Sequence, residues 1–365
     1  MSRIIILLSI IIGSIYCKGG FDEGFRQWML KNLKADEAAR MIRDDLVAGS
    51  FGGGKMDPNN RPIILVHGLN NEAGNLWKVR KDFASAGFNP YGMFGTSWGR
   101  GSERSNFNVK MSCDYVRHIR RFIEIVLWYT KAEQVDVMGY SMGSPIARKA
   151  ILGGKCVDNK GVDLGEPLTK KVHTFVSVAG ANQGSALCFL PWFDVCNKQT
   201  GLSCDSDFLR DINSKSNYEA TFRSYNLAST ADMVVGYQTC NRKASHFTGA
   251  HEWKIDGNNH DQTQFDTAAI QLKMIREGYA KQPVGRPVKA PSKPVKEAKK
   301  TPVKRAAPKK TLAKKATPTK KAPAKKAVQR RAAPAKKATP VKKGAPAKKD
   351  NKKAAAPAKK GDKRG

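Results

Sequence analysis

Several features that are typical of metal-binding, redox, glycosylated or membrane-spanning proteins are missing from this sequence. It has no Cys-x-x-Cys pair, which argues against a zinc ribbon or a thioredoxin-like redox motif. It has no Asn-x-Ser/Thr sequon for N-glycosylation. No apolar run after Ile15 is long enough to cross a bilayer, so we expect no transmembrane segment in the mature protein.

The first residues have the pattern of a secretory signal. A short basic start, Met1-Ser2-Arg3, precedes an apolar run from Ile4 to Ile15. As a helix this run would rise about 18 Å, which is too short for a bilayer core of about 30 Å. We therefore expect a signal peptide over residues 1–17 and a secreted, extracellular protein. A buried N-terminal helix is the alternative.

Six cysteines follow Cys17, and an even number of cysteines in an exported protein indicates disulfide bonds. They are Cys113, Cys156, Cys188, Cys196, Cys204 and Cys240. We expect up to three bridges. The sequence leaves their pairing open.

The basic charge of the chain is concentrated at its C-terminus. Residues Lys281 to Gly365 hold 31 of the 65 Lys and Arg but only three of the 31 Asp and Glu, so they carry most of the net charge of +34. Residues 282–365 consist mainly of Lys, Ala and Pro, and are predicted to be a disordered polycation. Such a tail should bind anionic surfaces of lipid, glycan or nucleic acid. A solvated tail without a specific partner is the alternative.

Short apolar strands alternate with helical segments after a polar, Gly-rich stretch over residues 18–60. The run Pro62–Val66 is apolar and β-branched, as in a buried parallel strand. Further strands are predicted over Val135–Met138, Val172–Val178, Phe222–Leu227 and Glu252–Ile255, and helices over Leu76–Ser85, Cys113–Thr130, Ser144–Leu152 and Thr263–Glu277. This alternation predicts an α/β fold over residues 18–281, with a mostly parallel central sheet and helices on both faces.

Gly139-x-Ser141-x-Gly143 lies between a predicted strand and a predicted helix, which is the context of a nucleophile elbow. The nucleophile of an elbow sits in a strained turn that holds its hydroxyl clear of the sheet. Glycines two residues to either side remove the collisions that larger side chains would cause. We expect Ser141 to be a catalytic nucleophile. A serine in an ordinary structural turn is the alternative.

A serine hydroxyl needs a base that is oriented by an acid, and in this kind of site the acid and then the histidine follow the serine in the chain. His260 follows a short strand and a turn rich in Asn and Gly, so it is the predicted base, with His251 and His246 as alternatives. His173 is expected to be structural. Asp232 follows a predicted strand and is the predicted acid, although a surface or helix-cap aspartate would fit the same pattern.

Acyl transfer also needs donors for the oxyanion of the tetrahedral intermediate. The backbone N–H of Met142, the residue after the nucleophile, is the first expected donor. The second should come from the loop after the first core strand, where we favour Leu69 over Asn70. His67, in the same loop, is expected to be a hydrogen-bonded scaffold.

Together these residues resemble the class 2 lipases, which include small secreted bacterial triacylglycerol lipases and nematode relatives. The resemblance covers about residues 60–278 and rests on four blocks in order, Leu65–Gly68, Gly139–Gly143, Ser229–Val235 and Ile255–His260. It implies an α/β-hydrolase fold, a Ser141-Asp232-His260 triad and hydrolysis of lipid carboxyl esters without a metal or organic cofactor.

The chain departs from the family pattern in three places. Tyr140 stands where such lipases often have His, a cysteine-bearing insert follows Ala181, and the basic tail instead resembles that of linker histones. In the insert, the apolar cluster Phe189–Phe193 would suit an acyl chain or a lipid surface, or would pack beneath the disulfides. A general esterase, a phospholipase, a hydrolase-fold binding protein without catalysis and, from the tail alone, a chromatin protein are the competing hypotheses.

Overall fold

The computed structural model describes residues 19–280, except residue 58 and residues 101–106, 190–192 and 215–217. The described residues fall within one of the two units into which the chain divides, residues 1–289. The predicted signal peptide and the predicted disordered tail lie outside the described residues, and both stay predictions.

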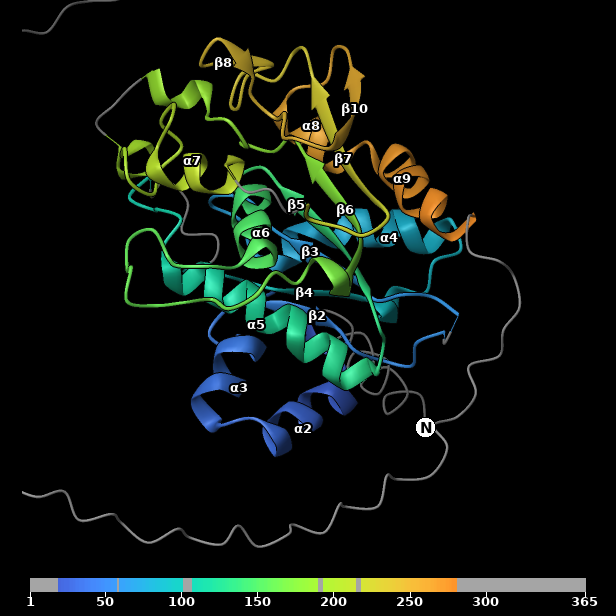
Figure 1. The fold of residues 1–365 in the computed structure, drawn as a ribbon. Coiled ribbons are helices and arrows are strands. Elements are labelled where there is room, and N and C mark those ends of the chain that lie inside the picture. The colour runs from blue at the N-terminus through green and yellow to red at the C-terminus, as the bar shows by residue number, and fades with distance from the viewer. Residues whose placement is uncertain (1–18, 58, 101–106, 190–192, 215–217, 281–365) are drawn as a thin grey trace, which may run out of the picture. The chain divides into compact units, whose positions relative to one another are not determined.

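An eight-stranded sheet runs through the centre of this unit (Figure 1). The strand order is β1-β2-β4-β3-β5-β6-β7-β10, and every neighbouring pair is parallel except β2 with β4. The strands are β1 Gly20–Phe21, β2 Ser50–Gly52, β3 Ile63–Val66, β4 Met93–Thr96, β5 Val135–Tyr140, β6 Val172–Val178, β7 Arg223–Ser229 and β10 Ala250–Ile255. The mostly parallel sheet predicted from the sequence is confirmed.

Both faces of the sheet are buried, and this explains the unbroken apolar strands. In β3, Ile64 and Val66 point into one hydrophobic cluster, whereas Ile63 and Leu65 point into another. Successive side chains of a strand face opposite sides of a sheet, so a strand covered on both sides needs apolar residues at every position.

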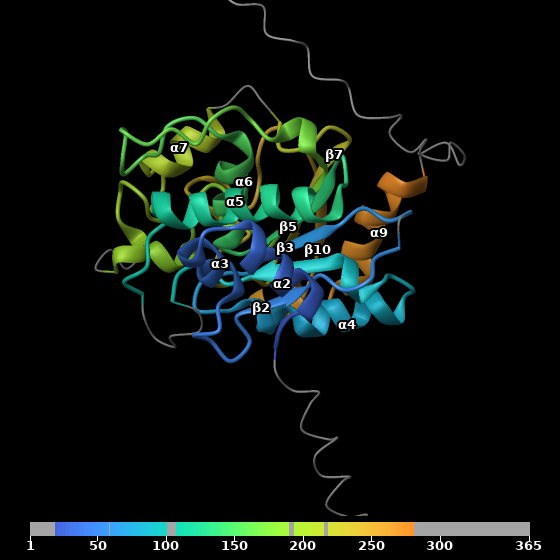
Figure 2. The same cartoon turned by 90° about the horizontal axis from the view of Figure 1, so that it is seen from below.

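Helices form the two outer layers (Figure 2). Buried side chains of the first cluster come from α2 Glu23–Asn32, α3 Ala35–Ile42, α5 Cys113–Thr130, α6 Gly143–Leu152 and α7 Asp207–Asn213. Those of the second come from α4 Trp77–Ser85 and α9 Ala268–Ala280. Helix α5 has the predicted bounds because Val116, Ile119, Ile123 and Val126 form one apolar stripe at helical spacing.

The end of the ordered chain differs from the prediction of one helix over Thr263–Glu277. The structure has two helices there, α8 His260–Phe265 and α9. A reciprocal capping box starts α8, in which the side chains of Asn259 and Gln262 each accept the other residue's backbone N–H. The helix stops at Asp266, which has non-helical backbone angles. His260 is therefore the first residue of a helix.

Three disulfides join the six cysteines of the described region, as Cys113–Cys156, Cys188–Cys196 and Cys204–Cys240. The expected number of bridges is confirmed, and the structure supplies the pairing that the sequence left open. The third bridge ties the insert between β6 and β7 to the small hairpin of β8 Gln238–Thr239 and β9 Arg242–Lys243. Among the described residues, no helix combines the length and hydropathy needed to span a membrane.

Candidate active site

Ser141 occupies a strained turn between β5 and α6. Its φ of 52° is in the left-handed region, which a residue with a Cβ adopts only at a cost in energy. Backbone hydrogen bonds hold the turn: the Ser141 N–H donates to the Val178 carbonyl at 3.0 Å, and the Ser141 carbonyl accepts from Ser144 at 3.1 Å. The residue is 8 % exposed, so little of it is open to solvent.

The two glycines of the elbow sit where a side chain cannot fit. A Cβ on Gly139 would lie 2.6 Å from the Cα of Ser144, and a Cβ on Gly143 would lie 2.2 Å from the carbonyl oxygen of His67. Both contacts are with backbone atoms, which cannot rotate away. The steric reason for glycine at both positions, inferred from the sequence, therefore holds in the structure.

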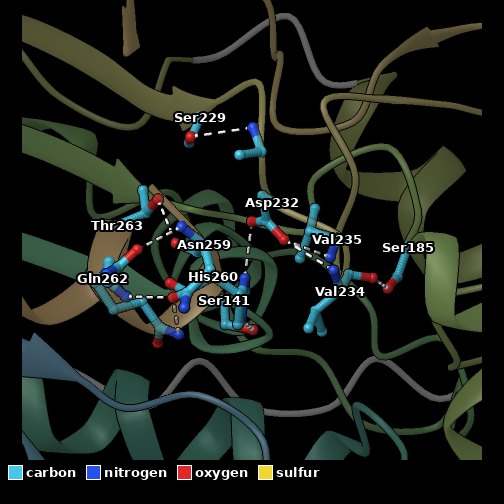
Figure 3. Close-up of polar contacts among 12 residues, drawn as sticks. Ser141, Ser185, Ser229, Asp232, Val234, Val235, Asn259, His260, Gln262 and Thr263 are labelled. Atoms are coloured by element: carbon cyan, nitrogen blue, oxygen red, sulfur yellow. Dashed lines mark hydrogen bonds and ion pairs between the residues drawn. The ribbon is translucent and has the colours of Figure 1, made fainter. Parts of the chain in front are cut away.

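Ser141, His260 and Asp232 form one continuous chain of hydrogen bonds (Figure 3). The Nε2 of His260 lies 3.0 Å from the Ser141 Oγ, and its Nδ1 lies 2.8 Å from the Asp232 Oδ2. The three side chains come from the ends of β5, β10 and β7. These strands run in the same direction, so their carboxyl ends meet at one edge of the sheet.

The loop after β7 is folded around the Asp232 carboxylate. Oδ1 accepts the backbone N–H groups of Val234 at 2.9 Å and Val235 at 3.0 Å, which leaves Oδ2 for His260 (Figure 3). Burial alone would raise the pKa of Asp232, but the hydrogen bonds from His260 and from the two valine amides outweigh it, and the pKa is lowered. These two amides were not predicted from the sequence, although an aspartate that accepts hydrogen bonds from the N–H groups two and three residues ahead is common in turns.

The alternative bases lie elsewhere. His246 is half exposed and contacts Glu252, and His251 lies on β10 against the ring of Tyr225. His173, expected to be structural, is part of β6 and stacks on the ring of Phe222. Of the four histidines that follow Ser141, only His260 has a hydrogen bond to its hydroxyl in the described part of the chain.

The loop after β3 lies against the nucleophile. A Cβ built on Gly68 would lie 2.9 Å from the Ser141 Cβ and 3.5 Å from its Oγ, so Gly68 lies directly against the nucleophile. Asn70, the second choice as donor, has a left-handed φ of 55°. Met142, at the start of α6, is fully buried.

His67 has the scaffold contacts expected of it. Its Nε2 accepts the Trp98 N–H at 3.1 Å, and its Nδ1 lies 2.8 Å from the Gly68 carbonyl, to which only an N–H can donate. The imidazole is therefore neutral, and burial lowers its pKa to about 4. Its ring stacks on Trp98 with a centroid distance of 4.8 Å.

Two of the cavities that have no triad residue in their lining are bordered by α5. One of about 360 Å³ borders the loop after β3, and its lining is mostly polar, including Asn70, Asn71 and Asn108. The other, about 900 Å³, lies between α3 and α5 and is lined by equal numbers of arginines and acidic residues. Within the described residues, no cluster of three or more His, Cys, Asp or Glu is placed to hold a metal ion.

The two aromatic residues at the ends of the insert's apolar cluster have different surroundings. Phe189 is 83 % exposed, whereas Phe193 packs on Phe107 with a ring-centroid distance of 4.7 Å, and residues 190–192 lie outside the described chain. Met233, the residue after Asp232, is also 83 % exposed. Because Leu187 donates to the Val234 carbonyl, the segments that carry Phe189 and Met233 are hydrogen-bonded neighbours.

Comparisons with solved structures find many chains of similar fold. A lipase of Bacillus licheniformis in its mature form matches with 14% identity over 61% of this chain and 95% of its own, at a TM-score of 0.45. A monoacylglycerol lipase of Paleococcus ferrophilus matches with 13% identity over 63% of this chain and 97% of its own, at a TM-score of 0.41. No curated protein matches the sequence significantly.

A family model gives the decisive comparison. The model described as Lipase (class 2) matches residues 60–273, a span that contains β3, the elbow, the Asp232 loop and His260. That span is more than half of the chain and is nearly the same as the span of the resemblance read from the sequence. The chain therefore belongs to the class 2 lipase family and is a carboxylic ester hydrolase with the α/β-hydrolase fold.

Proposed function

We propose that this protein is a secreted serine hydrolase that cleaves carboxyl esters of lipids through Ser141, His260 and Asp232. The observation that carries the proposal is the unbroken hydrogen-bond chain from the Ser141 hydroxyl through the imidazole to the carboxylate. A hydroxyl, a base and an acid in this order are the parts that nucleophilic acyl transfer requires.

The geometry supports a two-step reaction. His260 Nε2 takes the proton of the Ser141 hydroxyl as its oxygen attacks the ester carbonyl, and the imidazolium then gives that proton to the leaving alcohol. Water, deprotonated by the same imidazole, hydrolyses the acyl-enzyme. Asp232 keeps the Nδ1 proton of His260 in place and stabilises the imidazolium, and its lowered pKa keeps it ionised for this purpose.

Two backbone amides are proposed to stabilise the oxyanion. The Met142 N–H is at the positive end of α6, and the Leu69 N–H belongs to the residue after Gly68, which lies against Ser141. In the part of the chain that the structure describes, neither N–H donates to a backbone carbonyl in a turn, loop or cap. Asn70 stays the alternative to Leu69.

A lipid substrate fits the surface beside the acid loop. Phe189 and Met233 expose large apolar side chains on two hydrogen-bonded segments, one of which contains Asp232. Such side chains favour contact with acyl chains or with the surface of a lipid aggregate. Secretion is supported by the three disulfides, which persist in oxidising compartments.

The decisive test is Ser141→Ala, assayed on a soluble p-nitrophenyl ester and with a fluorophosphonate probe. We expect turnover to fall by about 10⁶-fold and labelling to disappear. Ser50→Ala is the control, because Ser50 is a buried serine on β2 whose hydroxyl bonds only the Ile42 carbonyl in the described structure. Near-native turnover by Ser141→Ala would refute the proposal. A wild-type protein that neither turns over esters nor reacts with the probe would instead indicate a hydrolase-fold binding protein.

A further inference from the structure

A closed ring of three buried polar side chains lies beside the nucleophile. The Ser144 hydroxyl is 2.8 Å from that of Ser177 and 3.0 Å from the Asn182 Oδ1, and the Asn182 Nδ2 donates to the Ser177 hydroxyl at 2.8 Å. All three residues are fully buried. If Ser177 donates to Ser144 and Ser144 to Asn182, each member of the ring both donates and accepts. A buried network satisfied in this way is rigid, whereas one with a missing partner is costly.

The ring is attached to the elbow through the carbonyl of Ser141. That carbonyl accepts the N–H of Ser144, a member of the ring, at 3.1 Å and the N–H of Ala181, the residue before Asn182, at 3.3 Å. The ring and the residue next to it therefore hold the backbone of the nucleophile. The approach is close, since a Cβ on Gly180 would lie 2.1 Å from the Ser177 hydroxyl. Ala179, directly after β6, has a left-handed φ of 48°, which is a second strained backbone position next to Ser141.

The other end of the same segment holds the acid loop. Ser185 Oγ donates to the Val234 carbonyl at 2.6 Å, as Figure 3 shows. The N–H of Leu187 donates to the same carbonyl at 3.0 Å, and the N–H of Ala186 donates to that of Val235 at 2.9 Å. The amides of these two valines fix the Asp232 carboxylate, so residues 180–187 connect the elbow to the acid.

We propose that Asn182 is a positioning residue for the hydrolysis, which sets the distance between the nucleophile and the acid through this segment. The Asn182 amide has one acceptor and two donors, and all three form hydrogen bonds. Two of these bonds are in the ring, and the second N–H donates to the Ser245 carbonyl at 2.9 Å. Alanine would lack all three bonds, and aspartate would lack both donors. The inference rests on the proposed function, since it assigns Asn182 a role in the reaction of Ser141 and Asp232.

The test compares Asn182→Ala and Ser144→Ala with Ser50→Ala, which removes a buried serine hydroxyl on β2, three strands away from β5 in the sheet. Each variant is measured for Tm, for kcat and KM on a soluble p-nitrophenyl ester, and for the rate of fluorophosphonate labelling. We expect kcat and the labelling rate of both ring variants to fall by about 10- to 100-fold with little change in KM, because small displacements of reacting groups have effects of this size. Ser50→Ala should lower Tm but keep the wild-type kcat.

The outcomes separate this inference from the proposed function. If wild-type protein is active and labelled but the ring variants keep kcat within the range of Ser50→Ala, the positioning role is wrong and the triad stands. If wild-type protein shows neither turnover nor labelling, the proposed function has failed instead. Should Asn182→Ala not fold, Ser144→Ala decides the question, because it removes one hydroxyl and no more.

Discussion

At the scale of single residues, burial and hydrogen bonding together determine the charge of the Asp232 carboxylate and of the His67 imidazole. Asp232 is nearly buried, which disfavours its charge, yet three hydrogen bonds hold its pKa below the usual range. His67 is buried too, but its Nε2 faces an N–H donor, so its neutral form is favoured. Asp232 is therefore charged and His67 neutral, although both are buried, because their hydrogen-bond partners differ.

The His67 environment predicts a loss of stability in mild acid. As the pH falls, the unfolded ring takes up a proton near pH 6.5, whereas the folded ring resists until about pH 4. The unfolded state thus binds more protons between these values, and its free energy falls relative to the folded state. Urea unfolding at pH 7 and pH 4.5 should show that His67→Asn, although less stable at pH 7, loses about 2 kcal/mol less than wild type over this interval. Equal losses would contradict the prediction.

At the scale of elements, local pattern predicted some parts of the fold and could not predict others. Strand β3 was predictable because it is a short, unbroken apolar run, and helix α5 was predictable because its apolar residues recur at helical spacing. The short β2 and β4 were not predicted, since a three- or four-residue strand is defined mainly by its neighbours in the sheet. The split between α8 and α9 depends on the capping residues of α8, which the spacing of apolar residues does not reveal.

The residues of the candidate site were also predictable only in part. The order of Ser141, Asp232 and His260 along the chain was enough to select them, because each follows a strand of the parallel sheet. The ring of Ser144 and Asn182 had no such signal. Serine and asparagine are common in turns and caps, and only the folded chain brings them together.

The elbow predicts a steric failure of Gly143→Ala. The new Cβ would lie 2.2 Å from the His67 carbonyl oxygen and 2.5 Å from that of Val66, so α6 and the loop after β3 must move apart. We expect a loss of about 1–3 kcal/mol in stability and much slower fluorophosphonate labelling. Gly20→Ala is the matched control, because nothing lies within 4 Å of its Cβ. A Gly143→Ala protein with the Tm and labelling rate of this control would show that the elbow does not need glycine there.

At the scale of the whole molecule, two parts of the chain have different charge and different composition. The family match ends at residue 273, and the residues after 280 hold nearly half of all Lys and Arg. In a lipid hydrolase, a polycation would determine where the enzyme adsorbs and would not change the reaction itself, because its attraction to an anionic surface needs no contact with the triad. Each basic residue near such a surface contributes about 1 kcal/mol, and the attraction weakens with salt.

Removing residues 285–365 should therefore separate adsorption from catalysis. We expect the full chain to bind vesicles of anionic lipid at low salt and to be released at high salt, and the truncated chain to bind neither anionic nor zwitterionic vesicles by charge. On a soluble p-nitrophenyl ester both proteins should have the same kcat, because the triad and its supporting loops lie before residue 280. Cosedimentation with vesicles at two salt concentrations measures the first effect, and the ester assay serves as the control for folding. If the truncated protein adsorbs to anionic vesicles as strongly as the full chain at low salt, the tail does not place the enzyme at charged surfaces.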